Sequence, residues 1–367
     1  MKVLVVCLFY REAGPVFSLG LSSGIASNNI DTFAVVSNKV TNKLEWDEAF
    51  DDDHIYYFKS ESFKKKPFSF IKELMEVRKK FRKMTFDYVV LTFPTKGDYL
   101  ISRFVSRKKC MMVLHDAIPH SSTDSRITLK LRNLLKRADY LIILSKLYKD
   151  YVEKEYGFDN NHVLYLRLGM LQYPRATNSK ASTQYKRNFL FFGRIDGYKG
   201  LNVLAEAYKD LISKYENISL TVAGNGDFSD YKDSFKDLKN VNLIIRYIDD
   251  DEIMNLFMQE NTVVVLPYID ASQSGVIPMA YFYGVPVIAT DVGAIKEQLF
   301  DGEVGLLCEA SNSASLKNAM EKFVSDTDFY INECEKMKEY SEKLTWKEIV
   351  KDFKDELLLS DRSEENA

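Results

Sequence analysis

The sequence predicts an α/β protein made of two doubly wound parallel sheets that follow one another along the chain. At 367 residues the chain is longer than one ordinary hydrophobic core accommodates, so two domains are expected. Short apolar runs rich in Val, Ile, Leu and Phe alternate with helical patterns, which is typical of parallel strands buried on both faces. The alternation stops in a polar stretch at 171–188 and then restarts, which indicates a connection between two domains.

The first domain is predicted over residues 1–172. Its opening run, MKVLVVCLFY, is interpreted as a buried strand and not as a signal peptide, because the run is short and Arg11 and Glu12 follow it at once. Further apolar runs predict strands at 33–37, 55–58, 88–93, 109–115, 140–145 and 162–168. Helical patterns between them predict helices at 69–84, 128–137 and 147–156.

Residues 173–187 are predicted to link the domains, and residues 188–344 to form the second domain. Its strands are expected at 189–194, 218–224, 241–246, 262–268 and 285–291. Its helices are expected at 201–215, 250–260, 276–284 and 313–326. An amphipathic helix at 345–360, which begins near Trp346, is expected to pack back on the first domain. The charged residues 361–367 are expected to be a disordered tail.

The composition narrows the class of protein. A hydrophobic fraction of 46% and a charged fraction of 28% are typical of a soluble globular protein, and no apolar run is long enough to span a bilayer. The four cysteines lack CxxC spacing and indicate free thiols in a reducing compartment. The acidic runs at 51–53 and 249–251 and the four histidines lack the spacing of metal sites. We therefore expect a cytoplasmic protein without a metal ion or cofactor.

The net charge of −3 conceals an asymmetry between the two halves. Residues 1–175 hold 29 Lys and Arg against 20 Asp and Glu, whereas the remainder holds 21 against 33. The basic excess peaks at residues 59–83, with ten Lys and Arg against three Glu. A basic face favours phosphates, nucleic acid or an anionic lipid surface, and it is equally typical of an ordinary solvated helix. No RNA-binding motif or aromatic stacking pattern is present, so nucleic acid is not expected as a partner.

The stretch GRIDGYKG, residues 193–200, places Arg194 and Lys199 where a predicted strand becomes a helix. A helix start presents unpaired backbone N–H groups and the positive end of the helix dipole. A guanidinium and an ammonium added there can hold two phosphates of a diphosphate. The alternative is a surface turn with two solvated cations.

A second candidate segment spans residues 272–309. Ser274-Gly275-Val276 stands where the run TVVVLPY gives way to the next predicted helix, and the small residues allow backbone amides to approach an anion. The alternative is an ordinary strand-to-helix unit with no ligand.

Taken together, these motifs resemble those of family 4 glycosyltransferases. GRIDGYKG followed by SGVIPMAYFYGVPVIATDVGAIKEQLFDGEVGLL resembles their carboxyl-terminal domain, and VAGNGD, RYIDDDEIMNLF and HDAIPH resemble other family segments. The likeness covers nearly the whole chain and is strongest over 190–310. It implies a retaining enzyme of the GT-B architecture, in which two Rossmann-like domains face each other across a cleft.

The resemblance implies roles for positions in the second domain. Arg194 and Lys199 would hold the donor diphosphate, helped by the backbone N–H groups of the SGV segment, while Tyr247 and Ile248 would flank the nucleobase. The implied donor-binding positions are Gly193, Arg194, Lys199, Tyr247, Ile248, Ser274, Gly275 and Val276.

One feature departs from the family pattern. Many members carry two glutamates with seven residues between them, and the second one holds the ribose hydroxyls. The matching positions here are Ala271 and Met279, as in an SGVIP-type variant that lacks the paired glutamates. Asp270, Gln273 or Ser274 could take over the ribose contact, and the sequence does not choose among them.

In the first domain, His115 ends an apolar strand, and the resemblance implies that it touches the donor sugar or the reacting centre. A neutral imidazole can bind a sugar hydroxyl or help remove the acceptor proton, and Asp116 would orient the ring or act as base. Gly14 and Pro15 would lie in a loop that closes over sugar and acceptor, together with His120. A purely structural role is the alternative for either histidine.

The sequence therefore predicts transfer of a sugar from a UDP- or GDP-sugar to a saccharide or lipid-linked acceptor, in cell-surface polysaccharide synthesis. The basic segment 59–83 would add peripheral contact with an anionic membrane at the inner face of the cell membrane. Two alternatives remain: an enzyme like UDP-N-acetylglucosamine 2-epimerase with the same fold, and a non-catalytic protein that binds nucleotide-sugars.

Overall fold

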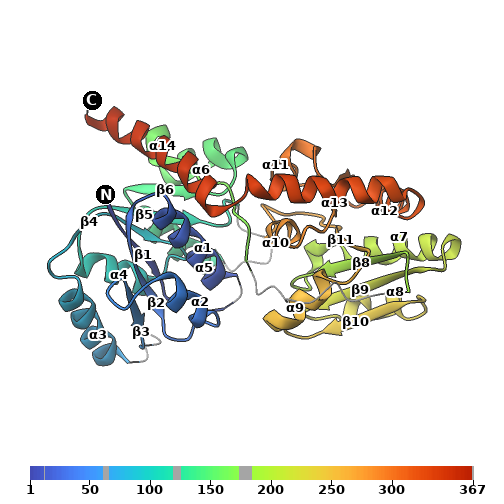
Figure 1. Ribbon diagram of the computed structural model, residues 1–367, viewed down its shortest axis with the longest axis horizontal. Coiled ribbons are helices and arrows are strands. Elements are labelled where there is room, and N and C mark those ends of the chain that lie inside the picture. Colours follow the sequence, from blue (N-terminus) through green and yellow to red (C-terminus); the bar gives the residue numbers. More distant parts are fainter. Residues whose placement is uncertain (12, 61–65, 119–124, 173–183, 366–367) are drawn as a thin grey trace. The chain divides into compact units, whose positions relative to one another are not determined.

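The computed structural model describes residues 1–11, 13–60, 66–118, 125–172 and 184–365. The chain forms two compact units, each built around one sheet (Figure 1). Unit 1 contains Met1–Leu171 and Leu344–Ala367, and unit 2 contains Gln172–Lys343. Every recorded strand pair in both sheets is parallel, with helices between successive strands, which confirms the predicted class of two doubly wound α/β halves.

The sheet of unit 1 has seven strands in the order β3-β2-β1-β4-β5-β6-β7. The strands are β1 (Lys2–Cys7), β2 (Asp31–Ser37), β3 (Ile55–Phe58), β4 (Thr85–Leu91), β5 (Ser106–Leu114), β6 (Tyr140–Ile143) and β7 (Val163–Tyr165). The helices of this unit are α1 (Gly14–Ser27), α2 (Lys43–Ala49), α3 (Pro67–Lys80), α4 (Lys96–Phe104), α5 (Ser125–Leu135), α6 (Lys149–Tyr156) and α14 (Trp346–Glu365).

Three helices of unit 1, namely α1, α2 and α4, were not predicted. The sequence of α1, GPVFSLGLSSGIAS, has no amphipathic period because small residues replace polar ones on much of its surface. The structure buries α1 on several sides at once, including Ser18 and Ser22, whose hydroxyls donate to backbone carbonyls within the helix.

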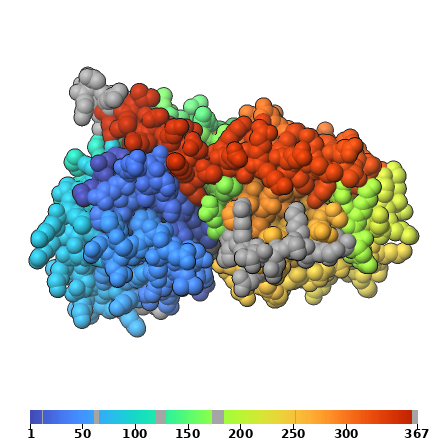
Figure 2. Space-filling model, viewed as in Figure 1, coloured from blue at the N-terminus to red at the C-terminus, as the bar shows by residue number. Residues whose placement is uncertain are grey.

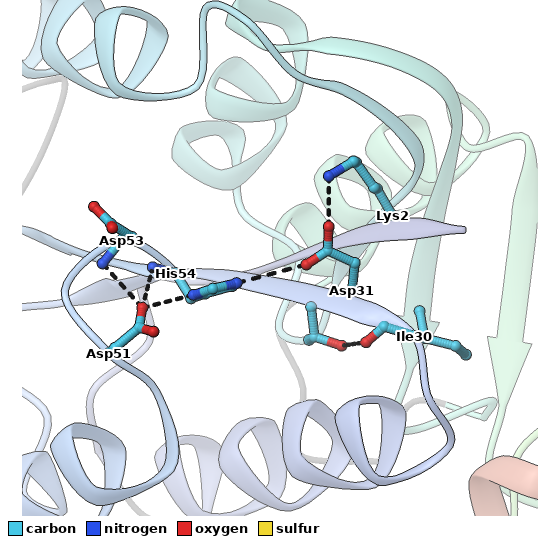
Figure 3. Close-up of polar contacts among 7 residues, drawn as sticks. Lys2, Ile30, Asp31, Asp51, Asp53 and His54 are labelled. Carbon is cyan, nitrogen blue, oxygen red and sulfur yellow. Dashed lines mark hydrogen bonds and ion pairs between the residues drawn. The ribbon is translucent and has the colours of Figure 1, made fainter.

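Charged side chains tie together the amino ends of the first three strands of unit 1 (Figure 3). Lys2 at the start of β1 pairs with Asp31 at the start of β2, with 2.5 Å between Nζ and Oδ2. His54, just before β3, lies 3.5 Å from the same carboxylate and 2.6 Å from Asp51. These contacts lie at the end of the sheet opposite the carboxyl ends of the strands.

The helix α14 packs on unit 1 through Trp346. Its indole donates to the carbonyl of Met170 at 2.8 Å and fills the space left by Gly20 and Gly169, where a Cβ atom would come within 2.7 Å of the ring. A Cβ atom on Gly24 would lie 2.5 Å from the backbone carbonyl oxygen of Trp346. Figure 2 shows the red atoms of α14 against the blue residues near the amino terminus.

The expected disordered tail at 361–367 is wrong for residues 361–365, which continue α14. The reason lies in Asp361, whose carboxylate accepts hydrogen bonds from the hydroxyls of Tyr88 and Tyr140. Both tyrosines come from strands of unit 1, so the polar end of α14 is fixed by tertiary contacts that its sequence does not show.

The sheet of unit 2 has six strands in the order β10-β9-β8-β11-β12-β13. The strands are β8 (Arg187–Phe192), β9 (Ile218–Gly224), β10 (Val241–Ile245), β11 (Thr262–Leu266), β12 (Val287–Thr290) and β13 (Leu306–Cys308). The helices are α7 (Leu201–Lys214), α8 (Lys232–Phe235), α9 (Asp250–Phe257), α10 (Val276–Tyr283), α11 (Ile295–Gln298), α12 (Ser313–Ser325) and α13 (Thr327–Glu342). Among these, β13, α8 and α13 were not predicted as elements, whereas a helical segment was expected to open at Glu297, inside α11.

Each sheet has one place where the strand order reverses direction along the chain. In unit 1 this is between β1 and β4, and in unit 2 it is between β8 and β11. Ligands of open parallel sheets bind outside the carboxyl ends of the strands at such a reversal. A ligand is therefore expected near the segments that follow β1 and β4 in unit 1, or near those that follow β8 and β11 in unit 2.

Across the described part of the chain, no helix combines the length and apolar character needed to cross a membrane.

Candidate functional site

The segment that follows β8 is GRIDGYKG, and its backbone is fixed against the turn after β9. The N–H of Gly193 donates to Ala223 at 3.0 Å, and that of Ile195 to Asn225 at 2.9 Å. A Cβ atom on Gly224 would lie 1.7 Å from the carbonyl oxygen of Gly193, so only glycine allows this approach. The glycines of VAGNGD therefore allow the GRIDGYKG loop to pack closely against the turn after β9.

The same loop also packs on the segment that follows β11. The N–H of Ile269 donates to Tyr198 at 2.8 Å. Gly200 has φ +70°, and a Cβ atom there would lie 1.8 Å from the carbonyl oxygen of Pro267. At the other end of the loop, a Cβ on Gly193 would come within 3.9 Å of Val276, the first residue of α10. The carboxyl ends of β8 and β11 thus bring both predicted anion-binding segments together.

The three backbone amides of the SGV segment differ in their hydrogen bonding. The N–H of Ser274 donates to Oε1 of Gln298 at 2.8 Å, and the N–H of Val276 donates to Oγ of Ser274 at 3.2 Å. Within the part of the chain that the structure describes, the N–H of Gly275 has no hydrogen-bond partner, and Gly275 is exposed. Gly275 is thus the amide best placed to meet a ligand at the start of α10.

The two predicted cations have different surroundings. Arg194 is exposed to solvent, whereas Lys199 is half-buried and its Nζ lies 3.6 Å from the centre of the Tyr268 ring. Tyr268 is fully buried, and its hydroxyl lies 3.2 Å from Oγ of Ser274. Neither Tyr268 nor Gln298 was singled out from the sequence. The position of Tyr268 directly after the strand run TVVVLP was a usable signal, whereas nothing local marks Gln298.

The positions expected around the nucleotide differ in how far they are exposed to solvent. Tyr247 is 53% exposed, while Ile248 is buried at 5%. Met279 and Ala271, which stand where many family members have glutamates, are both buried. Asp270 is exposed and Gln273 half-buried, so both side chains are nearer to solvent than Met279.

In unit 1, His115 follows β5 directly and its ring is held by aromatic neighbours. It stacks on Phe93 with 4.0 Å between ring centres and meets Phe17 edge-on at 4.9 Å. Its Nε2 lies 2.8 Å from the carbonyl oxygen of Thr92, which can only accept, so Nε2 carries the proton. Burial lowers the pKa of His115, which favours a neutral ring with the lone pair on Nδ1. Asp116, beside it, is exposed.

The other expected residues of unit 1 are placed differently. Gly14 and Pro15 are buried in the first turn of α1, so the expectation that they lie in a loop is wrong. The reason is packing: a Cβ on Gly14 would lie 2.4 Å from the ring of Phe9, and Pro15 suits the first helical turn. His120 lies outside the described residues.

A buried carboxylate that the sequence analysis missed lies beside this reversal of strand order. Asp98, in the first turn of α4, accepts hydrogen bonds from the N–H of Leu8 at 2.8 Å and the N–H of Thr95 at 3.0 Å. It thereby joins the exit of β1 to the start of α4. Burial raises the pKa of Asp98 to about 6, although these hydrogen bonds act in the opposite direction.

Replacement of Asp98 by Asn is expected to change how stability depends on pH. Because the pKa of Asp98 is raised on folding from 3.8 to about 6, the folded state binds more protons between these values, and stability falls as pH rises through the window. The wild type should therefore lose about 2 kcal/mol relative to Asp98→Asn between pH 4 and pH 7. Urea unfolding of both proteins at several pH values measures this difference.

The control for this experiment is Asp87→Asn. Lys108 lowers the pKa of Asp87, so any stability from that group is lost only as pH falls below about 4. A difference between wild type and Asp98→Asn that stays constant from pH 4 to pH 7 would contradict the raised pKa.

No group of three or more His, Cys, Asp or Glu residues with the geometry of a metal site occurs among the residues that the structure describes.

A protein-family model matches the part of the chain that holds the GRIDGYKG and SGV segments. Residues 174–344 match the family model of glycosyl transferases group 1. The match makes this segment similar to that family over slightly less than half of the chain. Both predicted anion-binding segments, together with Tyr268 and Gln298, lie inside the matched residues.

Curated relatives match over part of their length. The chain is 31% identical over 138 residues to a phosphatidyl-myo-inositol mannosyltransferase of Mycobacterium leprae, which covers 36% of each protein. It is 31% identical over 162 residues to a D-inositol 3-phosphate glycosyltransferase of an Arthrobacter species, which covers 42% of this chain and 38% of the relative. The chain thus spans less than half the length of these two relatives.

Solved structures match the whole chain at the level of the fold. HepE of Anabaena, solved with UDP-glucose, has a TM-score of 0.66 at 15% identity and covers 100% of both chains. A sucrose-phosphate synthase of Thermosynechococcus elongatus has a TM-score of 0.67 at 14% identity, covering 100% of this chain and 99% of that one. The architecture of the chain is therefore that of GT-B glycosyltransferases.

Proposed function

We propose that the chain is a retaining glycosyltransferase, a family 4 member of the SGVIP type, that moves a sugar from a nucleoside-diphosphate sugar to a saccharide or lipid-linked acceptor. One observation carries the proposal: within the residues that match the group 1 family, the loop with Arg194 and Lys199 packs on the segment that leads to the exposed amide of Gly275. Two cations and a helix start at the reversal of strand order form a site suited to a diphosphate.

The chemistry follows from where charge develops. When the bond between the sugar C1 and the diphosphate oxygen breaks, the nucleotide gains negative charge, so fixed donors that face it lower the barrier. In a retaining reaction the acceptor oxygen bonds to C1 on the face that the diphosphate leaves, and the acceptor proton passes to the departing phosphate oxygen. Arg194 and Lys199 supply positive charge there, so we propose that the reaction needs no metal ion.

The donor is proposed to be a UDP- or GDP-sugar. HepE was solved with UDP-glucose, and the curated relatives include a mannosyltransferase, which supports this class of ligand without choosing the base or sugar. In the proposed complex Tyr247 and Ile248 flank the base. Assembly of a surface polysaccharide is the proposed setting.

The proposal is tested by incubating the purified chain with UDP-, GDP- and ADP-sugars. A thermal shift with one nucleotide class identifies the donor, and mass spectrometry of acceptor mixtures, with and without EDTA, detects a lengthened saccharide. Free sugar epimers would instead indicate an epimerase, and a thermal shift without any product would indicate a binding protein. A product that forms only without EDTA would contradict the metal-independent reaction.

Unit 1 is proposed to hold the acceptor near His115. We propose that the neutral ring of His115 binds a sugar hydroxyl or helps remove the acceptor proton, with Asp116 beside it orienting the ring or acting as base. The Nε2–H of the ring donates to the carbonyl oxygen of Thr92.

The basic segment 59–83 is proposed to contact an anionic membrane through one face of α3 (Figure 1). Residues 61–65 lie outside the described residues. Two apolar residues of α3, Phe70 and Leu74, belong to the core, whereas Phe68 is 88% exposed and Ile71 and Met75 are also exposed. Basic residues exposed on the same helix are Lys72, Arg78 and Lys79. Exposed apolar side chains beside cations suit an anionic lipid surface.

Replacement of Phe68 by Ser is expected to weaken binding to vesicles that contain anionic lipid by several-fold, because the most exposed apolar ring of α3 is lost. Cosedimentation with vesicles measures the change. Leu44→Ser on α2 is the matched control, since Leu44 is 76% exposed and lies outside the basic segment. Equal binding by Phe68→Ser and wild type would dismiss the membrane contact.

A further inference from the structure

Tyr268 occupies a fixed place between the two anion-binding segments of unit 2. It follows β11 by way of Pro267, its side chain is fully buried, and its carbonyl oxygen accepts a hydrogen bond from the hydroxyl of Thr290 at 2.6 Å. A buried ring anchored through its own backbone has little freedom to move. The ring can therefore hold the groups that touch it in fixed positions.

One face of the ring supports Lys199. The Lys199 Nζ lies 3.6 Å from the ring centre, well inside the distance of about 6 Å at which a cation is attracted to an aromatic face. Tyr198 contributes a second ring at 4.8 Å. A lysine chain has several rotatable bonds, so without such support its ammonium would sample many positions.

The hydroxyl of the same ring contacts the other segment. It lies 3.2 Å from Oγ of Ser274, and that Oγ accepts the N–H of Val276 at the start of α10. The amide side chain of Gln298 holds the Ser274 peptide from the other side, by accepting from its N–H at 2.8 Å and donating to its carbonyl at 2.9 Å. Tyr268 and Gln298 together fix the peptide that precedes the exposed amide of Gly275.

We propose that Tyr268 is a positioning residue that sets the distance between the Lys199 ammonium and the start of α10, so that both meet the same diphosphate. This rests on the proposed function of the site and extends it to a residue that does not itself touch the donor. Its ring holds the cation and its hydroxyl holds Ser274, so the two parts of the side chain act on different segments.

The variants Tyr268→Phe and Tyr268→Leu separate these two parts. Phe keeps the ring under Lys199 and loses only the hydroxyl, whereas Leu loses both. We expect Tyr268→Leu to lower kcat/KM for the donor about tenfold and Tyr268→Phe to retain most of it, since cation–π contacts are worth about 0.5 to 2 kcal/mol. The loss should also be absent when Tyr268→Leu is introduced into a Lys199→Met background.

Tyr208→Leu is the matched control for lost packing. Tyr208 is equally buried in unit 2, and its hydroxyl contacts the backbone carbonyls of residues 218, 239 and 240. The positioning role is wrong if the kcat/KM of Tyr268→Leu, corrected for the folded fraction, equals that of Tyr208→Leu. It is also wrong if Tyr268→Leu still lowers kcat/KM in the Lys199→Met background.

A further measurement on the wild type needs no destabilised variant. The ring current of Tyr268 should shift the NMR signal of the Lys199 CεH2 group upfield, with the signal assigned by its absence in Lys199→Arg. An unshifted signal would overturn the proposal even if Tyr268→Leu fails to fold. A wild type that binds no nucleotide and forms no product would instead reject the proposed function, so the two failures are distinguishable.

Discussion

Alanine at Arg194 or Lys199 is expected to lower the rate of sugar transfer strongly while the chain stays folded. Arg194 is exposed and Lys199 half-buried, so neither side chain belongs to the hydrophobic core, and their removal leaves the packing of β8 and α7 intact. Each cation is proposed to stabilise charge that develops on the leaving diphosphate, and one such donor is worth about 10²- to 10³-fold in kcat. Initial rates with a saturating donor, together with circular dichroism spectra, measure both parts of the expectation.

Lys209→Ala is the matched control for Arg194→Ala and Lys199→Ala. Lys209 is an exposed lysine on α7 in the same unit, so its loss changes the net charge by the same amount without touching the loop. A double variant of Arg194 and Lys199 that still transfers sugar would contradict the diphosphate site, and with it the proposed function.

Gly200→Ala is expected to destabilise unit 2 and to remove donor binding. The residue has φ +70°, where a side chain costs about 1 to 2 kcal/mol, and its Cβ would lie 1.8 Å from the carbonyl oxygen of Pro267. The clash cannot be relieved unless the loop leaves the segment after β11, which moves Lys199 away from Tyr268. Urea unfolding and nucleotide titration should show both losses.

Gly197→Ala provides the comparison within the same loop. No atom of the described residues would lie within 4 Å of a Cβ at Gly197, and its φ is outside the left-handed region, so stability should stay close to that of the wild type. If Gly200→Ala were as stable as Gly197→Ala, the close contact between the GRIDGYKG loop and Pro267 would be wrong.

The strands were predictable because their signal is local. In both units a run of consecutive apolar residues marks a strand buried on two faces, and β3 and β9 fall at the predicted positions 55–58 and 218–224. Some helices with a polar face, such as α3 and α7, were predicted for the same reason, whereas α2, α4 and α13 were missed. The helix α1 escaped prediction because small residues let it pack on several sides, and the end of α14 did so because distant tyrosines hold Asp361.

The residues of the candidate site were also predictable only in part. The residues that would meet the diphosphate stand in short motifs at the ends of β8 and β11, so their spacing was visible in the sequence. The residues that arrange them were not: Gln298 reaches Ser274 from 24 residues away, and Asp98 reaches Leu8 from 90 residues away. A contact of this kind depends on how strands pair, which no local pattern records.

The sequence by itself determined the parallel α/β architecture and the presence of two cations at a strand end, because apolar runs and glycine turns act on their nearest neighbours. Only the tertiary structure decided that Lys199 rests on Tyr268, that Gly275 keeps an exposed amide, and that Phe68 and not Phe70 faces solvent. The physical reason is that burial and hydrogen bonding depend on which segments the fold brings into contact.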